Sequence, residues 1–293
     1  MFSRKGRTSK INVKREVKVA FQGEVGAYSE SAVYSQFGPS VRAKPIRELS
    51  EVFASVKEGD ALYGVVPAEN SIEGSVNQTY DLFLEYDLKV CGEIILKILH
   101  CLIAQPGSQV ESIKTVYSHP QALAQCRTYL GKLGCRLVPT FDTAGSVRMI
   151  KEERLDNSGA IASQRAAEIY GMSILDKEIG DMPNNYTRFF VLSKHDSPYT
   201  GKDKTSIIFS VKSFPGALFN VLKEFAVRNI NLTKIESRPT KRTPWAYNFY
   251  LDLEGHRTER ACQEALKSIK DKTLFMKILG SYRAATPTSE LNL

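Results

Sequence analysis

The sequence has no uninterrupted apolar run of about 18 residues, which excludes a membrane-spanning helix of ordinary length. It also has no G-x-G-x-x-G segment, so the fingerprint of a dinucleotide site is missing. Cysteine is scarce and scattered, and no two cysteines form a CxxC pair or show a zinc-ligand spacing. Five isolated cysteines, an odd number, favour free thiols in a reducing compartment over a disulfide framework.

Two potential metal ligands, His100 and Cys101, are adjacent, but no further ligand follows at a spacing typical of a metal site. Buried packing is therefore the expected role of both residues. We predict neither a metal nor another cofactor for this chain.

The formal charge of +8 is concentrated at the N-terminus. Residues 1–16 hold six Lys and Arg against one Glu and contribute +5, so +3 remains for all other residues. This tail lacks the apolar core of a secretory signal, and no aromatic residues interleave with its charges as in many nucleic-acid-binding segments. We expect a flexible basic tail or the remnant of a transit peptide, and no nucleic-acid partner.

The remaining residues show repeated strand-to-helix units. With 42% hydrophobic and 25% charged residues, a chain of 293 residues fits a soluble protein of about two domains. Short apolar strands, each followed by small polar residues and a helix, predict largely parallel sheets in two lobes and a cleft lined by helix N-termini. Strands are expected at 17–21, 63–66, 115–117, 137–141 and 160–162, helices at 29–37, 50–58, 144–153 and 164–170, and long crossing strands at 93–96 and 98–103.

Two polar segments lie at the ends of buried strands. The loop expected at 67–75 follows the strand at 63–66, at the position where open α/β sheets bind ligands. Residues 184–188 are polar and lead into the apolar run 189–192, which reads as a buried strand. Thr187 and Arg188 either cap this strand in solvent or face an anionic ligand in the cleft, and the pattern alone leaves both options open.

Beyond a polar linker the pattern changes. Strands expected at 206–211, 231–236, 245–253 and 275–279 alternate with helices at 216–228 and 260–269. The order βαββαβ is typical of a ferredoxin-like domain. Such a sheet has an open edge that can pair with a second subunit.

Three motifs in this order resemble those of the prephenate dehydratase family. They are PAENSIEG at 67–74, SHPQALAQC at 118–126 and TRF at 187–189. The resemblance extends from Val17 to about Pro287. The last ninety residues are similar to an ACT regulatory domain, in which 215–218 and 236–239 match the phenylalanine-sensing segments.

The resemblance implies an α/β fold with defined boundaries. A two-lobed catalytic domain, similar to type 2 periplasmic binding proteins, would span 17–193 and be followed by a ferredoxin-like ACT domain. The expected segments are lobe 1 at 17–97 and 178–193, lobe 2 at 98–177, a linker at 194–204, the ACT domain at 205–283 and a tail at 284–293.

The implied activity is conversion of prephenate to phenylpyruvate, with loss of water and carbon dioxide, in phenylalanine biosynthesis. The departing carboxylate pushes electrons toward the leaving hydroxyl and the ring becomes aromatic, so the substrate is its own electron sink. Arogenate dehydratase, whose substrate carries an amino group instead of the ketone, is an alternative. A third reading is a non-catalytic binding protein that senses amino acids.

The family places Thr187 at the catalytic position, as a hydrogen-bond donor to the leaving hydroxyl. Glu69 is the alternative proton source, because a carboxylic acid in a closed cleft can have a raised pKa. Arg188 would clamp a substrate carboxylate or brace the loop. The other expected substrate-binding residues are Asn70, Ser71, Ser118, His119, Gln125, Thr143, Ser163, Asn185 and Phe189. Helix capping is the alternative role of Thr143 and Ser163.

The resemblance also implies phenylalanine as an effector, bound between two protomers of a homodimer or homotetramer. We expect inhibition, and a cytoplasmic location or, if the tail is a transit-peptide remnant, a plastid one. The expected effector-binding residues are Gly216, Ala217, Leu218, Asn231, Glu236, Ser237, Arg238 and Pro239.

Overall fold

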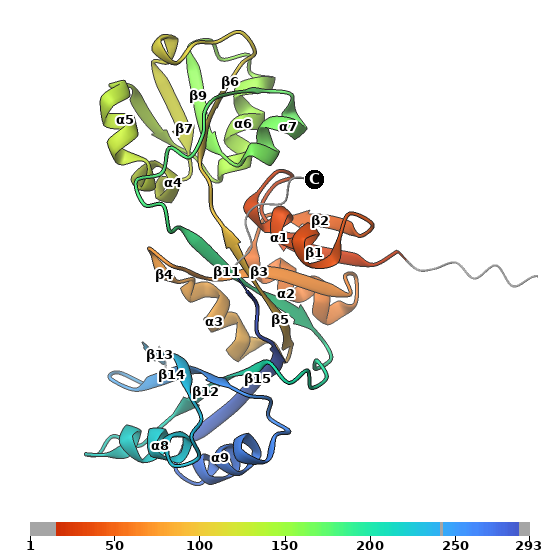
Figure 1. The fold of residues 1–293 in the computed structure, drawn as a ribbon, viewed down its shortest axis with the longest axis vertical. Helices are drawn as coiled ribbons and strands as arrows, with labels where there is room; N and C mark the ends of the chain where they lie inside the picture. Colours follow the sequence, from red (N-terminus) through yellow and green to blue (C-terminus); the bar gives the residue numbers. More distant parts are fainter. Residues whose placement is uncertain (1–15, 241–242, 287–293) are drawn as a thin grey trace, which may run out of the picture.

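The computed structural model describes residues 16–240 and 243–286. The basic tail predicted at 1–16 lies outside these ranges except for its last residue, as does most of the tail predicted at 284–293. Three sheets follow one another along the long axis of the molecule, two in the two N-terminal lobes and one in the C-terminal domain (Figure 1). Within the described ranges, no helix is long and apolar enough to cross a membrane.

Lobe 1 is built on a mixed sheet in which the strand order is β2-β1-β3-β11-β5, with the short β4 paired to β3. Strand β1 is parallel to β2 and β3, whereas β11 is antiparallel to both β3 and β5. The elements are β1 (Lys18–Gln22), α1 (Tyr28–Phe37), β2 (Arg42–Ile46), α2 (Leu49–Glu58), β3 (Tyr63–Asn70), β4 (Gly74–Ser75), α3 (Asn77–Glu85), β5 (Lys89–Lys97) and β11 (Tyr186–Ser193).

Lobe 2 has a second mixed sheet of order β10-β6-β9-β7-β8, in which β7 pairs in parallel with β8 and β9, whereas β6 is antiparallel to both of its neighbours, β9 and β10. The chain enters this lobe between β5 and β6 and leaves it between β10 and β11 (Figure 1). The elements are β6 (Cys101–Ala104), η1 (Val110–Ser112), β7 (Thr115–Ser118), α4 (Pro120–Gln125), α5 (Arg127–Leu133), β8 (Arg136–Pro139), α6 (Thr143–Glu152), β9 (Ser158–Ala162), α7 (Gln164–Tyr170) and β10 (Ser173–Asp176).

The C-terminal domain has the predicted βαββαβ order and an antiparallel sheet of order β13-β14-β12-β15. Helices α8 and α9 pack on one face of this sheet (Figure 1). The elements are β12 (Asp203–Ser210), α8 (Ala217–Ala226), β13 (Leu232–Pro239), β14 (Tyr247–Glu254), α9 (Arg260–Lys270) and β15 (Phe275–Arg283).

The other face of the C-terminal sheet packs against lobe 1. Tyr250 and Tyr282 from this sheet share one hydrophobic cluster with Tyr80 and Phe190 of lobe 1. The backbones of β15 and β5 are so close that a Cβ atom at Gly280 would overlap the carbonyl oxygen of Val90. Burial of this apolar surface holds the two domains together.

The two-lobed α/β architecture and the ferredoxin-like domain are confirmed, but three details are wrong. The sheets are mixed rather than largely parallel, because β11 and β6 run against their neighbours. The expected loop at 67–75 is a strand as far as Asn70. The linker expected at 194–204 ends earlier, because β12 begins at Asp203, whose buried carboxylate accepts hydrogen bonds from the N–H groups of Thr200 and Gly201.

Candidate active site

A cavity of about 310 Å³ lies between the two lobes. Lobe 1 contributes Asn70, Thr187 and Phe189 to its lining, and lobe 2 contributes His119, Gln125 and Thr143. These six belong to the residues that the sequence placed at the substrate, and the fold brings them together although they come from four separate elements or turns.

The ends of three helices face this cavity, as the sequence predicted. Its lining includes residues at the first turns of α1, α4 and α6. Asp142 caps α6 by accepting from the N–H of Gly145, and His119 caps α4 by accepting from the N–H of Gln121 at 3.2 Å. Among the described residues that line the cavity there is no Lys or Arg. A bound anion would therefore rely on helix N–H groups and neutral donors.

Asn70 and Thr187 are direct partners across strands β3 and β11. The Nδ2 atom of Asn70 donates to the hydroxyl oxygen of Thr187 at 3.0 Å. Its Oδ1 atom accepts from the backbone N–H groups of Ile72 and Glu73 at 3.0 and 3.1 Å, which fixes the orientation of the amide. Asn70 thus holds the turn after β3 and the Thr187 side chain in one arrangement.

His100 lies at the first crossing between the lobes and lines the same cavity, although the sequence suggested packing alone. Its Nε2 atom is 2.9 Å from Oε1 of Gln125, and its Nδ1 atom is 3.0 Å from the hydroxyl of Tyr28. Asn185, at the second crossing, donates to the same Gln125 oxygen at 2.9 Å. The sequence offered no signal for the contact between Tyr28 and His100, which are 72 positions apart.

Burial lowers the pKa of His100 below its ordinary value, against the opposing effect of its bond to Gln125. As the pH falls below about 6.5, the unfolded chain binds a proton at this position that the folded chain does not, so stability should fall. We expect the free energy of unfolding to decrease by at most about 1.4 kcal/mol per pH unit from this group.

Urea unfolding at pH 7.5, 6.5 and 5.5 measures this loss of stability. His119, whose pKa burial also lowers, contributes in the same direction. The His100→Gln variant should therefore show a smaller decrease than the wild type rather than none. An equal decrease in both proteins would contradict the lowered pKa of His100.

Three predicted substrate-binding serines do not line this cavity. Ser118 is fully buried and donates to the carbonyl of Ile161 at 2.6 Å, which joins β7 to β9. Ser163 caps α7 and donates to the carbonyl of Gly26 at 2.8 Å, which joins the two lobes. Ser71 donates to the carbonyl of Asn184 at 2.9 Å. Each of the three hydroxyls donates a hydrogen bond to a backbone carbonyl near the site. The prediction that these serines contact the substrate is therefore wrong, and their role is structural.

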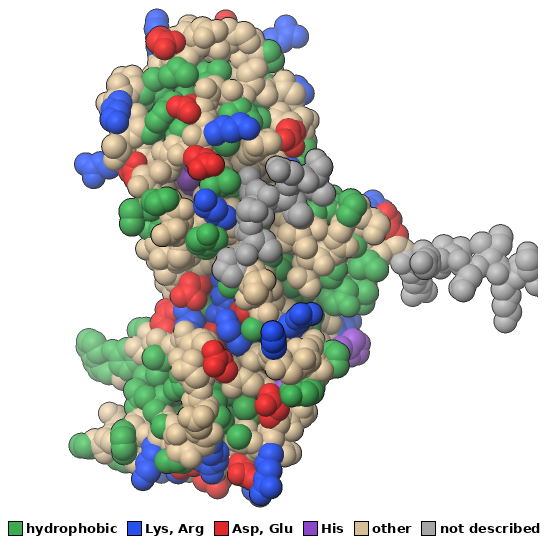
Figure 2. Space-filling view, in the orientation of Figure 1, with side chains coloured by type: hydrophobic (Ala, Val, Ile, Leu, Met, Phe, Trp, Pro, Cys, Tyr) green, Lys and Arg blue, Asp and Glu red, His purple; other side chains and the backbone are tan. Residues whose placement is uncertain are grey.

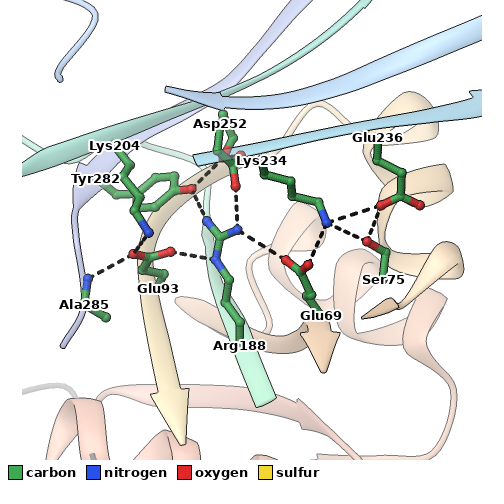
Figure 3. Close-up of polar contacts among 11 residues, drawn as sticks. Glu69, Ser75, Glu93, Arg188, Lys204, Lys234, Glu236, Asp252, Tyr282 and Ala285 are labelled. Atoms are coloured by element: carbon green, nitrogen blue, oxygen red, sulfur yellow. Dashed lines mark hydrogen bonds and ion pairs between the residues drawn. The ribbon is translucent and has the colours of Figure 1, made fainter. Parts of the chain in front are cut away.

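Arg188 does not line the cavity. Its side chain points into the interface between lobe 1 and the C-terminal domain (Figure 3). Its guanidinium contacts Glu93 at 2.6 Å, Asp252 at 2.5 Å and the Tyr282 hydroxyl at 2.9 Å. Burial opposes the charge, but Tyr282, Asp252 and Glu93 outweigh it and raise the pKa of Arg188. The expected carboxylate clamp is therefore wrong, and the alternative bracing role describes the geometry.

Glu69 lies on the same face of the lobe 1 sheet as Arg188 and does not line the cavity. Its carboxylate contacts Lys234 of β13 at 3.0 Å and Arg188 at 3.9 Å (Figure 3). Successive residues of a strand point to opposite faces, so β3 sends Asn70 to the cleft and Glu69 to the C-terminal domain. The prediction of Glu69 as the alternative proton source does not fit this position.

The predicted effector residues lie in two places of the C-terminal domain. Gly216 has φ +84° and precedes α8, with Ala217 and Leu218 in the first turn of that helix. On the edge strand β13, Glu236 contacts Lys234 at 3.2 Å and Arg238 contacts Asp81 of α3 at 3.2 Å. Ser237 lies between these two residues and Pro239 follows Arg238; both are exposed, and Asn231 precedes the strand. Their role in effector binding stays a prediction.

No three His, Cys, Asp or Glu side chains converge within 16–240 and 243–286 in a way that could hold a metal ion. The cavity offers hydroxyl, amide and imidazole groups and one carboxyl, that of Asp142. Burial raises the pKa of Asp142, against the bond from the Gly145 N–H. Such a set can bind and orient an anion and exchange hydrogen bonds with it.

Comparison with known proteins identifies both parts of the chain. A family model described as prephenate dehydratase matches residues 19–197, and one described as ACT domain matches residues 205–271. The bifunctional chorismate mutase/prephenate dehydratase of Aquifex aeolicus is 44% identical over 278 residues, which cover 94% of this chain and 76% of the relative. The chloroplastic arogenate dehydratase/prephenate dehydratase 2 of Arabidopsis thaliana is 41% identical over 290 residues and covers 95% and 76%.

Two solved structures are similar over most of the chain. A prephenate dehydratase from Arthrobacter aurescens in complex with L-Phe has a TM-score of 0.84 at 32% identity and covers 92% of this chain and 90% of its own. The quorum quenching acylase GqqA has a TM-score of 0.84 at 34% identity and covers 92% and 98%.

Proposed function

The chain belongs to the prephenate dehydratase family of lyases in phenylalanine biosynthesis, and we propose that its cavity performs the decarboxylating dehydration of prephenate to phenylpyruvate. One observation carries the proposal. The Thr187 hydroxyl lines the cavity and accepts a hydrogen bond from Asn70, so its own hydrogen is available to a ligand. A donor at this point can assist departure of the substrate hydroxyl.

The chemistry asks the protein to bind a dianion and assist one leaving group. The ring carboxylate leaves as carbon dioxide, its bonding electrons aromatise the ring, and the ring hydroxyl leaves with its electron pair as hydroxide, which takes a proton from solvent and becomes water. Helix N-termini and Gln121 can orient the two carboxylates in the cavity. Thr187 donates to the leaving oxygen, and aromatisation supplies much of the driving force, so a neutral hydroxyl suffices.

Arogenate is the second candidate substrate, and Asp142 is the observation that favours it. Its carboxyl lines a cavity that otherwise offers no charged group among the described residues, and arogenate carries an ammonium where prephenate carries a ketone. Opposite charges attract more strongly in a partly buried site than in water. The two substrates therefore differ most in their interaction with Asp142.

The test is a pair of assays with the full chain. Incubation with prephenate is followed by phenylpyruvate absorbance, and incubation with arogenate by the formation of phenylalanine. A higher kcat/KM with prephenate supports the proposal, and a higher value with arogenate reassigns the substrate. Binding of either compound without turnover would support the non-catalytic binding protein.

An acylase activity like that of GqqA has less support from the geometry. Acyl transfer by a threonine needs a general base within hydrogen-bond reach of the hydroxyl. Among the described residues, the hydrogen bond to Thr187 Oγ1 comes from the Asn70 amide nitrogen, which is a donor and not a base. The Thr187 side chain is therefore arranged to donate rather than to attack.

The C-terminal domain supports a proposal about regulation. The Arthrobacter aurescens relative is in complex with L-Phe. This chain has an ACT domain, and the sequence predicted a phenylalanine site in that domain. Large hydrophobic side chains are exposed on this domain, including Phe214, Phe219 and Trp245, and Figure 2 shows hydrophobic side chains along its outer edge. Exposed apolar surface of this kind favours association of two protomers. We propose a homodimer or homotetramer that binds phenylalanine between protomers.

Phenylalanine should inhibit the enzyme, and the Gly216→Ala variant should need at least about fivefold more phenylalanine for half-inhibition. Phenylalanine inhibits only if it binds a low-activity arrangement more tightly than the active one. A Cβ at φ +84° strains the turn that would approach the effector. Inhibition curves at fixed substrate concentration measure the change.

Gly171→Ala is the matched control, since Gly171 is also in the left-handed region, at φ +63°, but ends α7 in lobe 2. The Gly171→Ala variant should lose about as much stability as the Gly216→Ala variant and should still be inhibited by phenylalanine like the wild type. Equal inhibition of all three proteins would contradict the effector site at Gly216. The full chain is used because removing the C-terminal domain would uncover Tyr80 and Phe190.

Location follows from relatives rather than from the fold. A cytoplasmic enzyme is our proposal, in line with the free cysteines at all five positions. The Arabidopsis thaliana relative is named chloroplastic, so a plastid location is the alternative. The basic N-terminal residues on which this choice depends lie outside the described ranges.

A further inference from the structure

A continuous chain of hydrogen bonds connects Tyr28 to Thr187 through His100, Gln125, Asn185 and Asn70. We propose that His100 is a positioning residue that completes and holds this hydrogen-bond chain, whose direction the backbone at Asn70 sets, so that the hydrogen of the Thr187 hydroxyl faces the substrate. The inference rests on the proposed function of Thr187 and extends it to His100, which acts on the Thr187 hydroxyl through this chain.

The direction is set first at Asn70. Two backbone N–H groups, of Ile72 and Glu73, point at one atom of its side-chain amide. That atom must be the oxygen, because a nitrogen there would oppose donor to donor. The Nδ2 atom is therefore the one that faces Thr187 at 3.0 Å and Asn185 at 2.8 Å.

The orientation of each further side-chain amide is fixed by its hydrogen bond to the preceding residue of the chain. Because Asn70 donates to Asn185, the atom of Asn185 that receives the bond is Oδ1, and its Nδ2 faces Gln125 at 2.9 Å. Gln125 must then present Oε1 to Asn185. The same oxygen lies 2.9 Å from Nε2 of His100.

His100 closes the chain of constraints, because its Nε2 atom faces an oxygen and must carry a hydrogen. Burial favours the neutral imidazole, so Nδ1 is then unprotonated and accepts from the Tyr28 hydroxyl at 3.0 Å. Tyr28 also lies 2.8 Å from the carbonyl oxygen of Leu99, so its single hydrogen serves these two acceptors. The tautomer of His100 is thus dictated by Asn70, at the far end of the chain.

At the substrate end of the chain, the Thr187 hydroxyl is left in one orientation, as a hydrogen-bond donor toward the cavity. The Asn70 amide occupies a lone pair of the Thr187 oxygen, which leaves the hydrogen to point elsewhere, and Thr187 lines the cavity. Tyr28 comes from α1 in lobe 1 and Gln125 from α4 in lobe 2, whereas His100 and Asn185 lie on the two crossing segments. The chain is therefore complete only when both lobes are in this arrangement.

The direction can be tested without any activity assay. A long-range ¹H–¹⁵N spectrum of the histidine side chains at pH 7 distinguishes the two neutral tautomers and the imidazolium. The chain has four histidines, and loss of one signal set in the His100→Gln variant assigns His100. We expect the tautomer protonated at Nε2. The tautomer protonated at Nδ1, or an imidazolium, would overturn the proposal.

The kinetic test is a double-mutant cycle with Thr187. His100→Met removes the donor and should lower kcat about tenfold with little change in KM. His100→Gln can still present an N–H to Gln125 and should stay within about threefold of the wild type. In a Thr187→Val background, His100→Met should have almost no further effect, because the hydroxyl that the chain orients is gone.

A merely structural His100 would give a different pattern. Its replacement by Met would then lower kcat by the same factor with or without the Thr187 hydroxyl, and that result overturns the proposal. If the wild-type chain converts neither prephenate nor arogenate, the proposed function fails by itself, and the tautomer seen by NMR still decides whether the direction of the chain is correct.

Discussion

Replacing Arg188 by methionine should lower the free energy of unfolding by about 3–5 kcal/mol, the largest loss of stability that we expect from a single substitution in this chain. The Arg188 side chain is 11% exposed and lies between Glu93 and Asp252, which are 0% and 4% exposed. Removing the cation leaves two carboxylates buried with too little positive charge around them. Lys204 contacts Glu93 at 2.9 Å but does not replace the bond to Asp252.

Urea or thermal unfolding measures the effect, and Arg260→Met is the matched control. Arg260 is 93% exposed and pairs with Glu264 one turn along α9, an arrangement worth less than about 0.5 kcal/mol. Arg188→Lys should fall between the two, because lysine keeps the charge but cannot present the planar fork that reaches Glu93, Asp252 and Tyr282. A stable Arg188→Met protein with a raised KM would contradict this assignment and restore Arg188 as a substrate clamp.

The same contacts connect the C-terminal domain to β11, the strand that carries Thr187. Arg188 follows Thr187 directly on β11, and two of its partners, Asp252 and Tyr282, belong to the C-terminal sheet. Glu69, which precedes Asn70, is held by Lys234 of β13 in the same way (Figure 3). A displacement of the C-terminal sheet would therefore act on the two strands that carry the Asn70–Thr187 pair. This is a physical connection between the domains, and coupling of effector to activity has to be measured.

The sequence was informative wherever local pattern and long motifs agreed. The apolar run 189–192 is a buried strand, and Asp142 and Ser163 cap the helices predicted to follow them. The βαββαβ order of the last domain was correct because each of its elements is long and strongly patterned. Shorter or less apolar elements, β2, α5 and β10, were not predicted, since RAKPI and similar runs carry little periodicity.

The main error of the sequence-based prediction was the face of the lobe 1 sheet on which each site residue lies. Residues 67–70 were expected in a loop, where neighbouring side chains can converge on one ligand. They form the end of β3, where they alternate, so Asn70 and Thr187 face the cleft while Glu69 and Arg188 face the C-terminal domain. Even a correct strand assignment would not have shown which face of the sheet borders the cleft and which face contacts the C-terminal domain, because the C-terminal domain is distant in sequence.

Replacing Thr187 by valine should lower kcat by about 10²-fold or more, the range for a positioned proton donor. Valine keeps the branched shape and removes only the hydroxyl. The fold should persist, because the Asn70 amide nitrogen still has Asn185 Oδ1 at 2.8 Å and the carbonyl of Tyr186 at 3.2 Å as acceptors. We expect a change of less than about 1 kcal/mol in stability. Steady-state kinetics with the preferred substrate measure the loss.

Thr187→Ser is the control, because it keeps the hydroxyl and the hydrogen bond from Asn70 and loses only a methyl group. It should retain most of kcat. If the hydroxyl acts only in the transition state, Thr187→Val lowers kcat and kcat/KM together and leaves KM nearly unchanged, whereas loss of ground-state binding would raise KM at constant kcat. A valine variant with near wild-type kcat would remove Thr187 from the mechanism. The departing hydroxyl would then have to be assisted by another donor at the cavity, and Asp142, whose pKa burial raises, is the next residue to test.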